Sequence, residues 1–95
     1  MKRDGNMAIT AIVSHEIKDW DTFKEGFDAH DSVRKAVGIT AKAYKKMDSP
    51  NTVYVIGEIP SKEVFDEFFS DPSFHEHMEN IGVILPVDVT VLEEI

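Results

Sequence analysis

Two polar side chains that could do chemistry lie one helical turn apart in the stretch 19–38. This stretch has the periodicity of a helix, and His30 and Arg34 fall on its apolar stripe. The apolar members of that stripe are Trp20, Phe23, Phe27 and Val37. A His can act as a general base near neutral pH, and the fork of an Arg can hold a carboxylate or an enolate oxygen. Because buried polar groups need partners, the pair predicts either a polar pocket or a set of partners on this face.

Both side chains also have a purely structural interpretation. His30 could be a half-buried residue bonded to Asp31, to Glu25 or to a backbone carbonyl. Arg34 could be an extended side chain that pairs with Asp31 and favours the C-terminal end of the helix. The sequence leaves both alternatives open.

Four further residues are candidates for substrate binding. Trp20 and Phe27 share the stripe of the histidine and the arginine, and Tyr44 could donate a hydrogen bond into a cavity, although it also suits an ordinary strand position. His77 lies beside the apolar stripe of a second helical stretch, where core packing is the commoner role. His75 and His77 are two residues apart and point to different sides, so no metal site is expected.

Composition limits the class of protein. The chain of 95 residues fits one domain, and its net charge of −8 argues against nucleic-acid binding. It has no cysteine, which excludes disulfides and thiolate metal sites and fits a reducing compartment. No apolar run approaches the roughly 18 residues of a membrane span. We therefore expect a cytoplasmic protein with no membrane partner, a disordered tail over 1–6 and a single domain over 7–95.

The order of predicted elements indicates the fold. Strands are predicted over 7–17, 39–47, 52–59 and 86–94, and helices over 19–38 and 61–82, the second interrupted at 70–72. Ser61 is the candidate N-cap of the second helix. The order β-α-β-β-α-β predicts an α+β, ferredoxin-like fold, with a four-stranded antiparallel sheet and two helices on one face. Gly26, inside the first helix, suggests that something packs close to it.

Every predicted strand carries apolar residues on both sides, whereas two helices can cover only one side of the sheet. The second face therefore needs a partner, and a second copy of the chain is the simplest one. His15 ends the first strand, where we expect a structural role or a place at the dimer seam.

Three stretches carry a resemblance to a known family: DWDTFKEGFDAHDSVRKAVGI at 19–39, SPNTVYVIGEI at 49–59 and DPSFHEHMENIGV at 71–83. The chain resembles the dimeric α+β barrel superfamily over 7–95. That superfamily includes antibiotic-biosynthesis-monooxygenase-like proteins and cyclase-like or stress-responsive barrel proteins. The resemblance implies a homodimer whose two sheets face each other as a barrel, with a small-molecule pocket between the helices and the sheet of each subunit.

Members of the superfamily include cofactor-free oxygenases, haem-degrading enzymes, lactone isomerases and proteins of no known activity. This chain has a single Trp, at Trp20, and no Asn–Trp–His set of the haem-degrading kind, so we expect neither haem nor another cofactor.

Two functions compete. The first is a cofactor-independent enzyme, monooxygenase-like or cyclase- or isomerase-like, that acts on an apolar, weakly acidic organic molecule. In it, His30 is the base and Arg34 stabilises the developing negative charge. The second is a non-catalytic ligand-binding or stress-related dimeric module. A cavity of about 300 Å³ or more beside these two residues would favour the enzyme.

Overall fold

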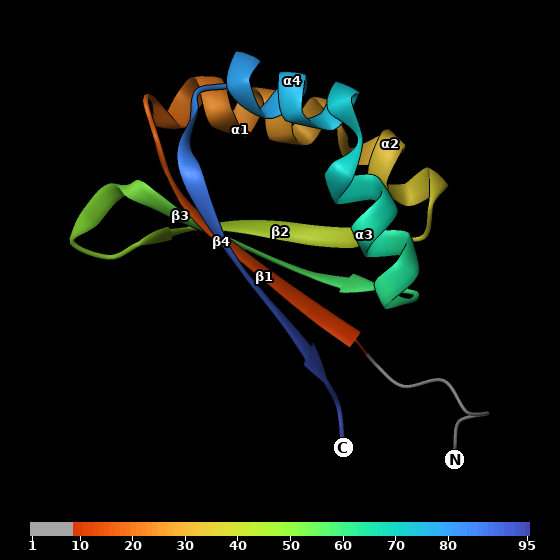
Figure 1. The fold of residues 1–95 in the computed structure, drawn as a ribbon. Coiled ribbons are helices and arrows are strands. Elements are labelled where there is room, and N and C mark those ends of the chain that lie inside the picture. Colours follow the sequence, from red (N-terminus) through yellow and green to blue (C-terminus); the bar gives the residue numbers. More distant parts are fainter. Residues whose placement is uncertain (1–8) are drawn as a thin grey trace.

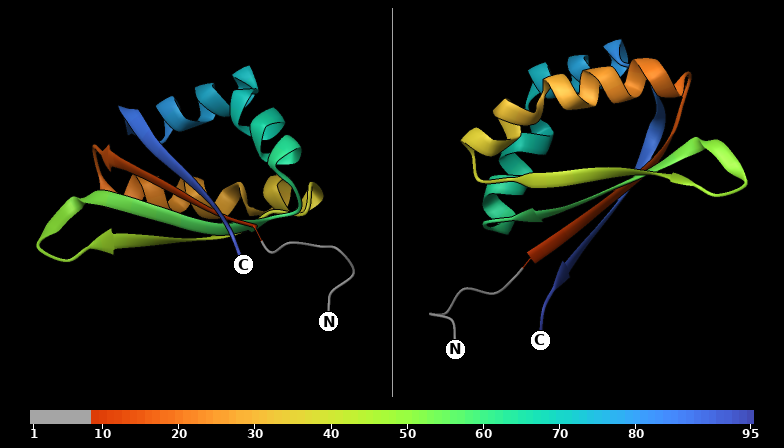
Figure 2. Two further views of the ribbon diagram at one scale, coloured as in Figure 1. Left: turned by 60° about the horizontal axis from the view of Figure 1, so that its bottom comes forward. Right: turned by 180° about the vertical axis from the view of Figure 1, so that it is seen from behind.

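The computed structural model describes residues 9–95, and the tail predicted over 1–6 lies outside them. A twisted sheet forms one layer and all helices lie against one of its faces (Figure 1). The two further views show the same two layers, with the opposite face of the sheet left without a helix (Figure 2). Among residues 9–95, no helix is long and apolar enough to cross a membrane.

The sheet has four antiparallel strands in the order β2-β3-β1-β4. Their bounds are Ile9–Ile17 for β1, Thr40–Lys46 for β2, Ser49–Ile59 for β3 and Val83–Glu93 for β4. This topology confirms the ferredoxin-like prediction, although β4 begins three residues before the predicted start at 86. The predicted start was placed at Pro86 because proline is common at the first residue of a strand, and this is too late by three residues.

Residues alternate between the two faces of the sheet as the pleat requires. Ala11, Val13 and His15 of β1 are buried under the helices, and Val13 lies opposite Val55 of β3 and Val89 of β4. The other face carries exposed apolar side chains, namely Tyr44, Ile56 and Leu92.

The helix predicted over 19–38 is divided into α1 (Trp20–Ala29) and α2 (Asp31–Ala36). The junction is His30, at φ −91° and ψ 2°, and its N–H contacts the carbonyls of both Gly26 and Phe27. The Arg34 side chain also bonds to the Phe27 carbonyl, which a continuous helix would use for its own ladder. Beyond this break the phase changes, so Val37 is 42% exposed and the prediction that it shares the apolar stripe is wrong.

The second helical stretch forms α3 (Lys62–Ser70) and α4 (Pro72–Asn80). The Ser61 side chain caps α3 by accepting a hydrogen bond from the Val64 N–H at 3.1 Å, as the sequence predicts. Gly26 of α1 meets Ile81, just after α4, so closely that a Cβ at Gly26 would lie 2.9 Å from the Ile81 Cβ. The prediction of close packing at Gly26 is therefore confirmed, and this approach brings α1 beside α4.

Candidate active site between the helices and the sheet

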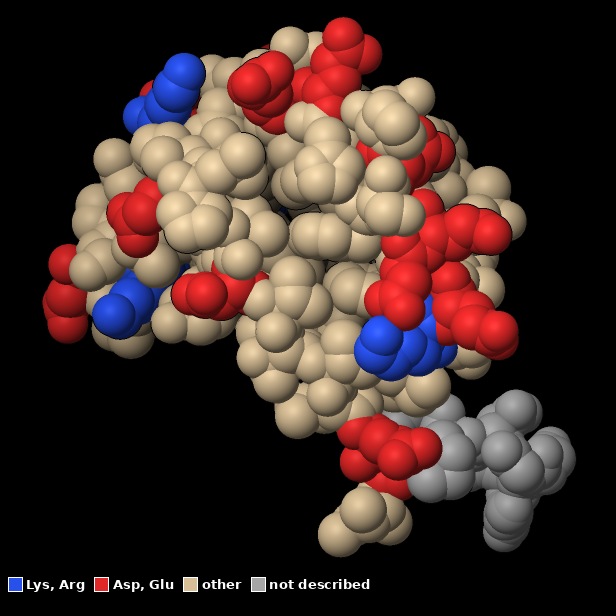
Figure 3. Space-filling view, viewed as in Figure 1, with Lys and Arg blue, Asp and Glu red and all other residues tan. Residues whose placement is uncertain are grey.

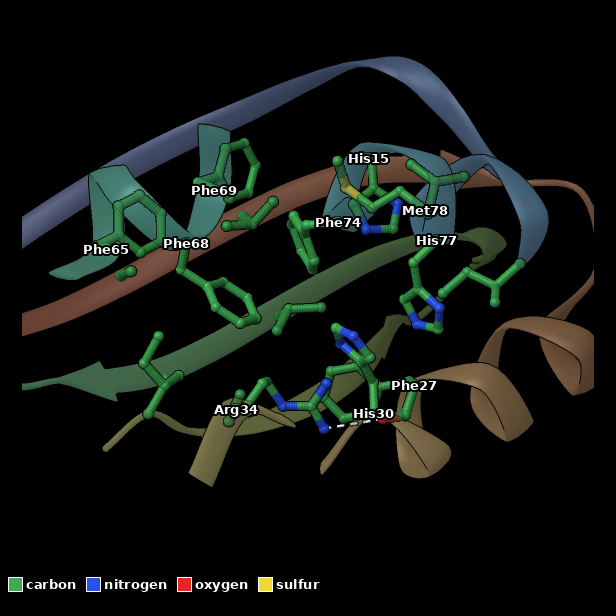
Figure 4. Close-up of a pocket in the computed structure, with 18 of the residues that line it drawn as sticks. His15, Phe27, His30, Arg34, Phe65, Phe68, Phe69, Phe74, His77 and Met78 are labelled. Carbon is green, nitrogen blue, oxygen red and sulfur yellow. Dashed lines mark hydrogen bonds between the residues drawn. The ribbon is translucent and has the colours of Figure 1, made fainter. Parts of the chain in front are cut away.

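A cavity of about 90 Å³ lies between the helices and the sheet, and both His30 and Arg34 line it (Figure 4). On the sheet side the wall includes three small residues, Ala11, Ala41 and Gly57, among larger aliphatic ones. Seen from the side, a narrow hollow opens among uncharged residues (Figure 3). The volume is below the range of about 300–1,000 Å³ that is usual for ligand pockets.

Arg34 is buried, with only 6% of its surface exposed. Its Nη2 donates a hydrogen bond of 2.9 Å to the Phe27 carbonyl, and its Cζ lies 3.9 Å from the centre of the Phe27 ring. The nearest carboxylate oxygen, on Asp31, is 3.8 Å from Nη2, so the suggested ion pair is a long one. Burial lowers the pKa of Arg34, and this is opposed by Asp31 and Asp28. Its Nε has no hydrogen-bond partner among the described residues.

His30 and His77 stack on each other, with ring centroids 4.0 Å apart and an angle of 20° between the planes. We call these two residues the histidine pair. The Nδ1 of His30 and the Nε2 of His77 are buried and have no partner among the described residues. The pKa of His30 is lowered by burial, then by His77 and Arg34. The pKa of His77 is also lowered by burial, partly offset by the backbone of Gly26.

His15 is a third histidine in the cavity wall. The sequence predicts for it a structural role or a place at the dimer seam. It points to the helix side of the sheet, where its ring packs edge-on against Phe23 at 5.4 Å. Its Nδ1 lies 3.2 Å from the Glu16 carbonyl, and burial lowers its pKa. The alternation with Ala11 and Val13 was the signal for this position. We refer to His15, His30 and His77 together as the cavity histidines.

Two of the predicted substrate-binding residues do not line the cavity. Tyr44 is 48% exposed and, since β2 alternates, it lies on the opposite face from Ala41. Trp20 packs beside Phe23 at 6.0 Å between ring centroids, at the edge of the core, and the Lys45 ammonium lies 4.9 Å from the centre of its ring. Phe27 and His77, by contrast, do line the cavity.

Aromatic side chains of α3 and α4 form the wall opposite His30. The Phe74 ring stacks on the His30 ring at 5.8 Å and 23°, and the Phe68 ring lies 4.7 Å from that of Phe74. Phe65 and Phe69 complete this wall. The sequence marks the phenylalanines as apolar helix faces, but only the meeting of these helices with α1 shows that they enclose a cavity.

The polar part of this site consists of one cation and three imidazoles. A neutral imidazole can accept a proton, and a fixed guanidinium can stabilise the anion that is left behind. Within the described part of the chain, no group of three or more His, Cys, Asp or Glu side chains is arranged to hold a metal ion. The arrangement therefore suits acid–base chemistry on an apolar molecule.

Comparison with protein-family models and with curated proteins finds no match. Solved structures, however, share the fold. A protein from Bordetella bronchiseptica, proposed to be an antibiotic biosynthesis monooxygenase, is 13% identical with a TM-score of 0.77, covering 95% of this chain and 98% of the other. SnoaB, a cofactor-independent oxygenase from Streptomyces nogalater, is 12% identical with a TM-score of 0.72, over 90% of this chain and 91% of the other.

A third similar structure is the monooxygenase from the gene ActVA-Orf6 of Streptomyces coelicolor, in complex with the ligand nanaomycin D. It is 17% identical with a TM-score of 0.64, and the match covers 96% of this chain and 90% of the other. These likenesses agree with the resemblance found in the sequence. The chain has the ferredoxin-like α+β fold of the antibiotic-biosynthesis-monooxygenase-like proteins.

Proposed function

We propose that this chain is a cofactor-independent enzyme that removes a proton from a small, weakly acidic organic molecule bound between the helices and the sheet. One observation carries the proposal: three buried nitrogens without partners, on His30, Arg34 and His77, belong to side chains that line a single apolar cavity. A buried polar group without a partner costs about 1–3 kcal/mol, so a ligand that satisfies these nitrogens is strongly favoured.

The roles follow from the chemistry of each group. His30 accepts the proton from an O–H or an acidic C–H of the substrate, because its lowered pKa keeps the ring neutral at pH 7. The Arg34 Nε–H then donates to the anion. That anion is activated either for reaction with O₂, as in a monooxygenase, or for rearrangement, as in a cyclase or isomerase. SnoaB, a similar structure, is a cofactor-independent oxygenase, which supports the first of these.

A second function is favoured by the volume of the cavity. At about 90 Å³ it is smaller than the 300 Å³ expected for an enzyme pocket, and this fits a non-catalytic ligand-binding or stress-related module. Under the enzyme proposal, the aromatic wall must move when a substrate enters. Phe68 and Phe74 are the side chains whose displacement would enlarge the cavity.

We also propose a cytoplasmic homodimer, formed through the uncovered face of the sheet. The exposed side chains of Tyr44, Ile56 and Leu92 on that face support this, since an apolar face of this kind is normally covered. Sedimentation equilibrium at micromolar concentration should return twice the chain mass of 10.7 kDa. A monomer under those conditions would contradict the barrel arrangement.

The function is tested by a screen followed by an activity assay. Thermal unfolding is measured with a panel of phenols, enolisable ketones and small acids, because a ligand of the folded state raises the melting temperature. Ligands found in this way are then assayed for O₂ consumption and for isomerised products. His30→Gln should abolish turnover, whereas the matched variant His75→Gln, on a residue outside the cavity lining, should not. Stabilising ligands without turnover would favour the module.

A further inference from the structure

The polar groups of the cavity are unusual in their charge. Apart from backbone groups, the polar groups of its wall are those of one arginine and the three cavity histidines. No carboxylate or hydroxyl side chain is among the described residues that line it. Arginine stays protonated in proteins, so Arg34 brings a permanent positive charge into an otherwise apolar space. The Asp31 carboxylate nearest to it is 3.8 Å away and 44% exposed, on the outer side of α2. The side of Arg34 that faces the cavity thus lacks a counterion.

The histidine pair can take up at most one proton beyond its two neutral rings. Its rings stack with centroids 4.0 Å apart, and two charged imidazoles at that distance would repel each other strongly. Arg34 disfavours even the first proton, since its charge acts on both rings. His15 from β1 is buried and adds no negative charge, and the Asp28 and Asp31 carboxylates act mainly on Arg34. No titratable side chain of α3 lines the cavity.

An anion in the cavity would reverse this balance. It would supply the counterion for Arg34 and would also favour a proton on the histidine pair. With one added proton, one ring carries N–H groups on both nitrogens and the other ring, in the matching tautomer, on one. The two unpartnered histidine nitrogens can then each donate a hydrogen bond to an anion in the cavity. The aromatic wall around His30 suits a flat apolar body behind that oxygen.

We propose that the cavity binds a flat organic oxyanion, such as an aromatic carboxylate or phenolate, together with one proton that resides on the histidine pair. The inference rests on the proposed function, because it names the substrate class of the same site. In addition, the anion and the proton bind together, so that binding leaves the net charge of the cavity unchanged. A weakly acidic substrate that passes its proton to His30 creates the same charge state within the cavity.

This linkage makes the affinity for an anion depend on pH. Where the free histidine pair is neutral and the occupied pair is protonated, the association constant rises about tenfold for each unit by which the pH falls. A neutral molecule of the same shape gains nothing from the proton, so its affinity stays constant over the same range.

The test uses benzoate as the probe and benzamide as its neutral counterpart. Calorimetric titrations of the unmodified protein between pH 6.5 and 7.5, in two buffers of different ionisation enthalpy, give the affinity and the number of protons taken up. We expect benzoate to bind with uptake of close to one proton and an affinity that rises about tenfold over that interval as the pH falls. NMR signals of the His30 and His77 rings should shift with benzoate, and that of His75 should not.

A matched pair of variants checks where the proton goes. His77→Gln should reduce the proton uptake, while His75→Gln should leave it unchanged. Benzoate binding that is independent of pH, or benzamide binding as tightly as benzoate, overturns the proposal while leaving a ligand site in the cavity. Failure of benzoate to bind at any of these pH values also overturns it, and the screen of weak acids then decides the proposed function separately.

Discussion

The close approach at Gly26 gives a sharp prediction about how α1 and α4 are held together. In Gly26→Ala, the new Cβ would lie 2.9 Å from the Ile81 Cβ and closer still to its Cγ2. Ordinary carbon–carbon contact begins near 3.5 Å, so Ile81 must retreat by at least about 0.6 Å. Overpacking of this kind costs about 1–3 kcal/mol, and the better helix propensity of alanine returns at most about 1 kcal/mol.

The expected net loss in the free energy of unfolding therefore lies between zero and about 2 kcal/mol. For a domain of this size each kcal/mol lowers the melting temperature by about 4–8 °C, so a thermal or urea unfolding experiment can resolve it. Glu25→Ala, on the exposed side of the same helix, is the control and should change stability by no more than about 0.5 kcal/mol.

The cause is identified by a double-mutant cycle. Ile81→Ala removes the atoms that meet the new Cβ, so Gly26→Ala should cost about 1–3 kcal/mol less in that background than in the unmodified protein. In the single variant Gly26→Ala, separation of the two stacked rings should raise the pKa of His30 toward its ordinary value, because the charge of His77 is one cause of its lowering. A coupling energy near zero, with an unchanged pKa of His30, would refute the reasoning.

Three further predictions concern the same region. Arg34→Met removes the hydrogen bond to the Phe27 carbonyl and should lower the free energy of unfolding, measured in urea, by about 1–3 kcal/mol. An unchanged free energy of unfolding would contradict a role of Arg34 at the junction of α1 and α2. Phe27→Ala should cost roughly 3–5 kcal/mol in the same assay, whereas Lys24→Ala on the outer face should cost less than about 1 kcal/mol. Equal losses would mean that α1 does not turn its Phe27 side toward the core. The pKa values of the cavity histidines are all lowered, so the unfolded chain takes up protons first as the pH falls below 6.5. The free energy of unfolding should thus be lower at pH 5.5 than at pH 7.5, and equal values would show that these residues titrate normally.

The order of elements was predictable from the sequence because each element carries its own local signal. Alternation marked the strands, and caps such as Ser61 marked where helices begin. Boundaries were harder where tertiary contacts decide them. At the break at His30 the Arg34 side chain donates to the Phe27 carbonyl, and helical periodicity does not indicate that contact.

The candidate site was predictable only in part. Helical spacing brought His30 and Arg34 to one face, and both line the cavity. Stacking of His30 on His77 could not be predicted, because it depends on how closely α1 approaches α4. Tyr44 was misplaced for a simple reason: a strand residue moves to the opposite face with each step, and a preference for aromatic residues in strands does not indicate which face is covered.

The contact between Trp20 and Lys45 gives the molecule a built-in spectroscopic reporter. Trp20 is the only tryptophan in the chain, so intrinsic fluorescence excited at the indole band comes from this one position. The ring joins the start of α1 to β2 through the Lys45 ammonium and packs beside Phe23 in the core. When α1 leaves the sheet, the indole loses the Lys45 ammonium and enters water, and its emission should move to longer wavelength. Separation of the helix layer from the sheet can therefore be followed in the unlabelled protein.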